Sequence, residues 1–257
     1  MKKQLFAAAL ALFACAAHAA PCGVADGDAS NALRHAAKMG DVKNVRCLLE
    51  HGASVNAAGV NGWTALMGAA LSGHADTVRL LLDEGAQVSA TNQEGRTALM
   101  FAAMMGNIGA ARMLVEKGAQ IDAADKVGVA ALALAAWGGH TDTVRLLIDK
   151  GAQVNAASKD GDTALIAAVS NGYTDTVRLL IEKGADVNAA THNGYTVLMW
   201  AALKGHADTA RLLIEKGARV NAADTRGRTA LELAQAFAPT EGRAAIVDML
   251  RAAGAKE

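Results

Sequence analysis

The sequence predicts an all-helical array of stacked repeat units, and three observations support this fold class. Glycines recur every 33 residues in two unbroken sets, one of them at positions 62, 95, 128, 161, 194 and 227. The text between them repeats as well, as in GWTALMGAALSGHADTVRLLLDEGAQVSA and GDTALIAAVSNGYTDTVRLLIEKGADVNA. Apolar residues make up 52% of the 257 residues but aromatic residues only 4%, so alanine and aliphatic side chains must supply the core. A fixed period of this size is typical of stacked supersecondary units.

The first helix of each unit is expected to begin after a threonine, whose hydroxyl can accept a hydrogen bond from a free backbone N–H. The helix then reads A-L-x-x-A-A, and its alanines let neighbouring helices approach closely. It ends at a glycine such as Gly73, Gly172 or Gly205, which readily adopts a left-handed conformation. In the fourth unit Ala130 replaces the threonine, at an expected cost of about 1 kcal/mol. The threonines are Thr64, Thr97, Thr163, Thr196 and Thr229.

A second helix follows in each unit and ends at a glycine of the other set. In the second unit Val78, Leu81 and Leu82 are spaced to bury one stripe, and Gly85 ends the helix. A hairpin-like segment containing Asn or Asp then leads to the next glycine. Because a unit of about 33 residues cannot cover its own apolar face, stability must come from stacking.

The first residues are typical of an export signal. Lys2 and Lys3 are followed by the 13-residue apolar stretch 5–17 and by the A-x-A sequence Ala17-His18-Ala19. We therefore expect residues 1–19 to be a signal peptide and the protein to be periplasmic. The alternative is a lipid anchor on Cys15, although Phe13 is bulky for such a processing site.

Residues 20–29 are expected to form an N-terminal arm, and residues 30–257 a repeat domain of seven units including the caps. The first unit, residues 30–57, lacks the glycine-led turn and is expected to be the N-terminal cap. The last unit carries four extra residues around positions 238–241. Arg251 stands where several inner units have Leu or Ile, which suits a cap that faces water.

The two cysteines that would remain after cleavage are Cys22 and Cys47. An even pair in an oxidising compartment favours a disulfide, which would close a 25-residue segment. The alternative is that Cys47 is an ordinary small apolar residue, since Leu80 lies at the equivalent position one unit later.

Several function classes are disfavoured by the sequence. Lys plus Arg and Asp plus Glu each number 25, and no block of like charges suggests a nucleic-acid partner. No apolar run reaches the roughly 18–20 residues that span a bilayer, so we expect no integral membrane segment. No catalytic, phosphate-binding or C-x-x-C motif is found, so neither an enzyme nor a cofactor is expected.

The motifs resemble those of ankyrin-repeat proteins from about Ser30 to Gly254: G-x-T-A-L, A-A-x-x-G-H, V-R-L-L and G-A-x-V-N-A. The usual T-P-L-H reads T-A-L-M at residues 64–67, without the proline. The resemblance implies an ankyrin solenoid that binds a partner protein through a concave groove. It also places His74, His140 and His206 in one register two units apart, too distant to share a metal, so we expect them to be structural.

When the units are compared with one another, some positions hold different residues from unit to unit. Such positions do not determine how the units stack. By resemblance, these positions line the groove. Large aromatic residues there are typical of interface anchors. The alternative is that they lie flat over neighbouring turns and cover the stack; Phe101 and Trp200 are expected to be core. The predicted partner-binding residues are Trp63, Leu71, Arg96, Met104, Met105, Val129, Trp137, Tyr195, Leu203 and Phe237.

We therefore expect a non-enzymatic, monomeric binding module of the bacterial envelope with a protein partner. The alternative is a periplasmic carrier of copper or of a small molecule that uses Met and His. It rests on Met67, Met100 and Met199 in one register and on Met104, Met105 and Met113 in the third unit. Adaptable packing is the other explanation of these methionines, and no metal-binding residues are assigned.

Overall fold

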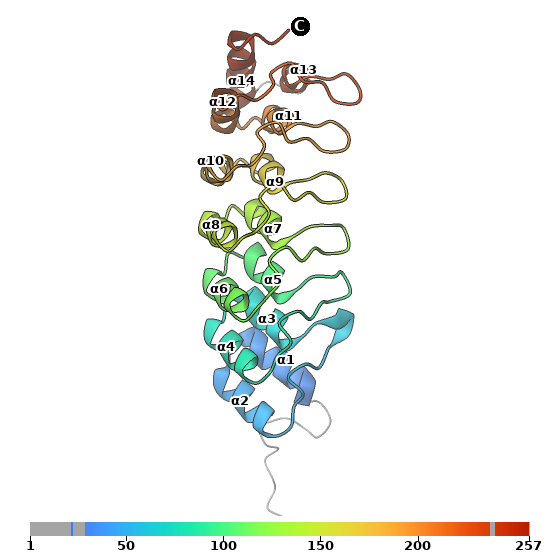
Figure 1. Ribbon diagram of the computed structural model, residues 1–257, viewed down its shortest axis with the longest axis vertical. Coiled ribbons are helices and arrows are strands. Elements are labelled where there is room, and N and C mark those ends of the chain that lie inside the picture. Colours follow the sequence, from blue (N-terminus) through green and yellow to red (C-terminus); the bar gives the residue numbers. More distant parts are fainter. Residues whose placement is uncertain (1–21, 23–28, 237–239, 257) are drawn as a thin grey trace, which may run out of the picture.

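The computed structural model describes residue 22 and residues 29–236 and 240–256. Within these residues the chain folds into seven helix pairs, which stack along one axis with an inner and an outer column of helices (Figure 1). The inner helices are α1 (Ala29–Met39), α3 (Ala65–Ser72), α5 (Ala98–Met104), α7 (Ala131–Trp137), α9 (Ala164–Ser170), α11 (Val197–Lys204) and α13 (Ala230–Gln235). The outer helices are α2 (Val42–Glu50), α4 (Ala75–Asp83), α6 (Ile108–Glu116), α8 (Thr141–Asp149), α10 (Thr174–Glu182), α12 (Ala207–Glu215) and α14 (Glu241–Ala252). The predicted fold class and the count of seven units are confirmed.

The helix boundaries lie where the repeat pattern predicts them. Each predicted threonine cap accepts a hydrogen bond from the backbone N–H three residues later, as Thr64 does from Met67 over 3.3 Å. Ala130 makes no such bond at the start of α7. Gly73 ends α3 with a φ of 77°, in the left-handed region where glycine is favoured.

The core runs between the two columns and along the whole stack. The paired alanines of the inner helices, such as Ala69 and Ala70, are fully buried, so successive inner helices pack closely. The outer helices bury most of their predicted stripe: in α4 Val78 and Leu81 are fully buried, whereas Leu82 is only partly buried and Leu80 is buried instead. No unit covers this surface alone, because each inner and outer helix packs against its counterpart in the next unit.

The connecting segments form finger-like loops that project from the same side of the stack (Figure 1). An isolated antiparallel bridge closes the base of each of five fingers, as between Thr91 and Thr97. Each finger also bonds to the preceding one through the backbone, as in Lys126 N–H to the Glu94 carbonyl over 2.9 Å. A short 3-10 helix, η2 (Val60–Gly62), occupies the first finger.

Side chains at the start of the outer helices hold successive units together. The ring of His140 lies against Gly106 of the preceding unit, and its Nε2 lies 3.0 Å from the Met104 carbonyl oxygen. His206 makes the equivalent contact with the Ser170 carbonyl. This geometry supports the structural role expected for the register histidines.

Buried threonine hydroxyls form a second link between outer helices. The hydroxyl oxygen of Thr209 lies 2.9 Å from that of Thr174 in the preceding unit, and Thr176 pairs in the same way with Thr141. Thr77 occupies the equivalent position in α4, but the residue before it in the stack is Val42. Its buried hydroxyl therefore has no hydrogen-bond partner among the described residues.

None of the described helices combines the length and the hydropathy needed to cross a membrane. The predicted signal peptide, residues 1–19, and the alternative lipid site at Cys15 lie outside the described residues, as does most of the arm at 20–29. The extra residues of the last unit lie partly outside them, because positions 237–239 are not described.

Candidate partner-binding groove

A groove of about 570 Å³ crosses the middle of the stack on the side of the inner helices. Its walls come from α5, α7, α9 and α11, which follow one another in the inner column (Figure 1), and from the bases of the neighbouring fingers. We call it the central groove. Its lining residues are Arg96, Met104, Val129, Ala133, Leu134, Trp137, Asp162, Thr163, Ile166, Ala167, Ser170, Asn171, Trp200 and Lys204.

The hollow forms because one register position changes size along the stack. This position holds Leu134 in α7, Ala167 in α9 and Trp200 in α11, and all three line the groove. The alanine side chain stops at Cβ, whereas its two neighbours in the stack are large. A small residue between two large ones therefore leaves a gap that the units themselves do not fill.

The groove wall is largely apolar, with a few charged groups at its edges. Trp137 is 56% exposed, an unusual position for so large an apolar side chain. Burial raises the pKa of Asp162 above its ordinary value of 3.8, and the carboxylate of Asp160 adds to the rise. Arg96 is held by ion pairs with Glu94 and with the buried Asp125, each at 3.2 Å.

Trp200 corrects one expectation from the sequence. It was expected in the core with Phe101, which is indeed buried, but Trp200 is only partly buried and lines the groove. Its Nε1–H is covered and has no hydrogen-bond acceptor among the described residues. The sequence did contain a sign of this, since the equivalent position changes in size from Phe101 to Leu134 to Trp200. A position that varies so much does not determine how the units pack.

The structure brings four of the predicted partner-binding residues into the central groove: Arg96, Met104, Val129 and Trp137. Met105 is 51% exposed at the end of α5 but does not line the groove. Leu71, in α3, and Leu203, in α11 between the groove residues Trp200 and Lys204, are partly buried and do not line the groove. Phe237 lies outside the described residues. The predicted set is therefore divided between one groove and scattered positions along the same column.

Two of the predicted aromatic anchors pack against neighbours. The ring of Trp63 lies 4.5 Å from that of Phe101 in the next unit. The ring of Tyr195 lies 5.5 Å from that of Trp200, and its hydroxyl accepts a 2.6 Å hydrogen bond from the Arg228 guanidinium. Both side chains are partly buried, which agrees with the alternative that they cover the stack.

The methionines do not converge on one site. Met67, Met100 and Met199 are at most 1% exposed. Met104 lines the central groove, whereas Met113 lines a shallow hollow between α4 and α6 on the outer column. The thioethers that favoured a copper carrier are therefore either buried or on different faces.

The structure joins Cys22 and Cys47 in a disulfide. Cys22 packs against the core, which ties the described part of the arm to the end of α2. His51 lies beside the bridge, a contact that the spacing of the cysteines does not predict. Among the described residues, these three form the only group of three or more His, Cys, Asp or Glu side chains whose ligand atoms lie close enough together to hold a metal.

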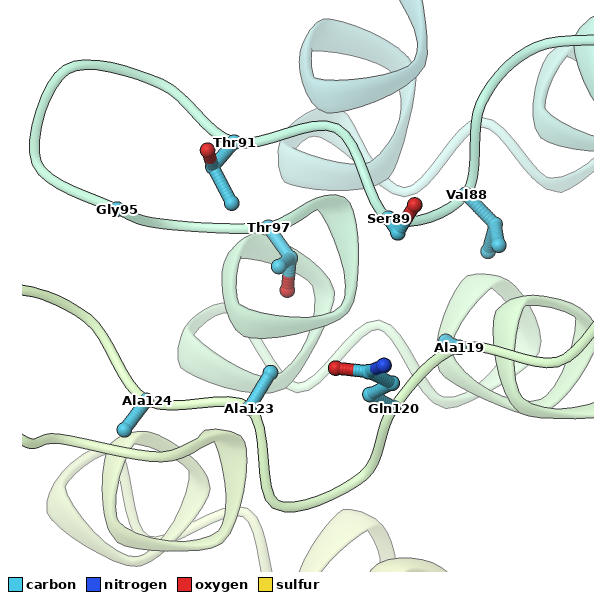
Figure 2. Close-up of a pocket in the computed structure, with 9 residues that line it drawn as sticks. All are labelled: Val88, Ser89, Thr91, Gly95, Thr97, Ala119, Gln120, Ala123 and Ala124. Atoms are coloured by element: carbon cyan, nitrogen blue, oxygen red, sulfur yellow. The ribbon is translucent and has the colours of Figure 1, made fainter.

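A second hollow, of about 240 Å³, lies between the third and fourth units at the bases of their fingers. Figure 2 shows its nine lining residues, with Thr97 and Gln120 reaching into the space from two facing segments. None of the nine is ionisable, and the Thr97 hydroxyl already caps α5. This hollow therefore offers no ionisable side chain.

Comparisons with known proteins agree with this architecture. A family model described as "Ankyrin repeats (3 copies)" matches residues 5–92, 33–125, 85–158, 119–191 and 186–256. The crystal structure of the human ASB11 ankyrin repeat domain is similar, with a TM-score of 0.78 and 25% sequence identity over 88% of this chain and 98% of that one. A search of curated proteins finds no match. Ankyrin repeats in general are non-enzymatic protein–protein interaction modules. The chain belongs to the ankyrin-repeat family.

Proposed function

We propose that this chain is a non-enzymatic binding module that holds a segment of a partner protein in the central groove. The observation that carries the proposal is the largely apolar groove itself, with Trp137 more than half exposed on its wall. Interface anchors are commonly tryptophans in pockets that the partner closes. An exposed tryptophan beside an unfilled hollow offers such a pocket.

The groove chemistry restricts the partner segment. Leu134, Trp137 and Trp200 offer apolar contact for one large apolar side chain. The Asp162 carboxylate forms no ion pair among the described residues, and its raised pKa reflects the burial of a charge without a cation. A basic group on the partner would form an ion pair with this carboxylate and offset the cost of burying its charge. We therefore expect a segment with a large apolar residue next to Lys or Arg.

The experiment is quantitative capture from an extract of the source cell with three baits: wild type, Trp137→Ala and Ile108→Ala. Ile108 is also exposed but lies at the start of α6 in the outer column, so it is a matched control for the loss of an apolar side chain. A prey retained by the Ile108 variant and lost by the Trp137 variant supports the groove. Equal recovery on all three baits refutes it.

We also propose that the module is exported to the periplasm of a bacterium. The order of basic, apolar and small residues in 1–19 supports this location. Mass spectrometry of the protein isolated from its source would find Ala20 as the first residue. An acylated Cys15 would instead show a lipid-anchored form of the same module, and an intact Met1 would contradict export.

A further inference from the structure

The cluster of Cys22, Cys47 and His51 is a group of metal ligands that the proposed function does not use. The Nδ1 atom of His51 lies 3.7 Å from the sulfur of Cys22 and 3.9 Å from that of Cys47. Cys47 is near the end of α2 and His51 follows as its C-cap, four residues later, so the helix itself places these two side chains together. Cys22 comes from the arm.

These separations match a metal site once the sulfur–sulfur bond is opened. Zinc binds thiolate sulfur at about 2.3 Å and imidazole nitrogen at about 2.0 Å. In tetrahedral geometry a sulfur and a nitrogen on the same ion are then about 3.5 Å apart, and two sulfurs about 3.8 Å apart. The two nitrogen–sulfur distances are already close to this value. Breaking the sulfur–sulfur bond leaves the two sulfurs free to move apart to that spacing.

We propose that reduction of the Cys22–Cys47 disulfide creates a binding site for one thiophilic d¹⁰ metal ion, Zn²⁺ or Cu⁺, with His51 as the third ligand. Reduction by a dithiol transfers two electrons and two protons: the dithiol leaves as a disulfide, and each cysteine becomes a thiol. The metal then displaces the two thiol protons and binds both thiolates. Soft thiolate ligands together with imidazole select these ions.

The proton on His51 must also change position. Its Nδ1 lies 2.8 Å from the Cys47 carbonyl oxygen, so in the bridged form Nδ1–H donates to that oxygen. Coordination through Nδ1 requires the other neutral tautomer, with the proton on Nε2. Because His51 is exposed, Nε2 can meet solvent in that tautomer. Metal binding therefore replaces the hydrogen bond that His51 makes to the end of α2.

The test is a titration of the whole protein, oxidised or reduced with a phosphine under nitrogen. The probes are Co²⁺, as an absorbing substitute for Zn²⁺, and Cu⁺ in competition with bicinchoninate. We expect the reduced protein to bind a single ion, shown by a thiolate-to-cobalt charge-transfer band or by removal of Cu⁺ from the chelator. The oxidised protein should show neither signal. Circular dichroism checks that the reduced array stays folded.

Two variants separate this site from adventitious binding. His51→Ala should weaken the reduced site more than about tenfold, since losing even an outer-shell partner costs about 10–100-fold. His192→Ala is the matched control, because this exposed histidine lies on a finger tip far along the chain and its loss should change nothing. Absence of both signals in the reduced wild type, or equal affinity in the His51 variant, overturns the proposal.

Discussion

The missing cap of α7 allows a direct test of how the array is stabilised. The backbone of Ala130 has φ −98° and ψ 167°, and the threonine caps of the neighbouring units, Thr97 and Thr163, have −94° and 167° and −100° and 168°. Their burial is also alike, at 9%, 6% and 7% exposed. A threonine at position 130 can therefore adopt its neighbours' conformation and bond to the backbone N–H of Ala133 without rearrangement.

Ala130→Thr should raise the free energy of unfolding by about 1 kcal/mol, the usual contribution of such a cap. For an array of this size that corresponds to about 2–4 °C in Tm. The assay is urea unfolding followed by circular dichroism, with an unchanged dependence on urea as the sign that only stability has changed. Thr163→Ala is the matched control and should lose about the same amount.

The opposite result would be a urea midpoint that Ala130→Thr leaves unchanged or lowers while Thr163→Ala is destabilising. In that case the extra methyl and hydroxyl would be poorly accommodated at this one cap, and the close geometric match between units would not imply equal energetics. Because repeat arrays can lose two-state behaviour, both variants should be compared by two probes, fluorescence and circular dichroism.

Three further predictions follow from the same structure. Thr77→Val should stabilise the fold by about 1 kcal/mol or more, because it removes a buried hydroxyl that has no hydrogen-bond partner among the described residues. In the same urea assay Thr209→Val should destabilise the fold by about 1 kcal/mol, because it removes a hydroxyl that is hydrogen-bonded. Equal effects of the two substitutions would contradict this prediction. Asp162→Asn should raise the free energy of unfolding at pH 7 but not below about pH 3.8. The raised pKa of Asp162 in the folded protein means that its ionised form opposes folding, whereas its protonated form does not. A difference in stability between the variant and the wild type that persists below this pH would contradict the prediction. Gly106→Ala should lower Tm more than Gly85→Ala. Both glycines have positive φ, but only at Gly106 would the new Cβ atom meet a neighbouring ring, that of His140. Equal losses in Tm would mean that this ring moves aside at no energetic cost.

The fold could be predicted almost completely from the sequence, because the signals for helix starts, helix ends and packing faces recur in several units. Glycine at the helix ends, threonine at the helix starts and alanine on the packing faces each recur at one spacing, and the structure uses them as their chemistry requires. A single substitution such as Ala130 was also visible, since the other units define what is missing.

The groove was harder to predict because it arises from differences between units. Ala167 is unremarkable alone, and the hollow exists only because larger residues lie above and below it in the stack. Similarly, variability identified Trp63 and Tyr195 as free positions but could not reveal that each packs on a ring of its own chain. The approach of His51 to Cys22 depends on where this cysteine packs against the end of α2, which no periodicity encodes.

The most direct test of the central claim is to fill the groove while keeping all of its large apolar lining residues. Ala167→Trp places a tryptophan at the register position where the next inner helix already carries one, Trp200. The affinity of the captured partner is then measured by calorimetry for the wild type and for this variant, with equal Tm as the condition for comparison. We predict that binding weakens more than about tenfold, or 1.4 kcal/mol, because the new ring occupies the hollow. An unchanged dissociation constant would show that the partner does not bind in the central groove.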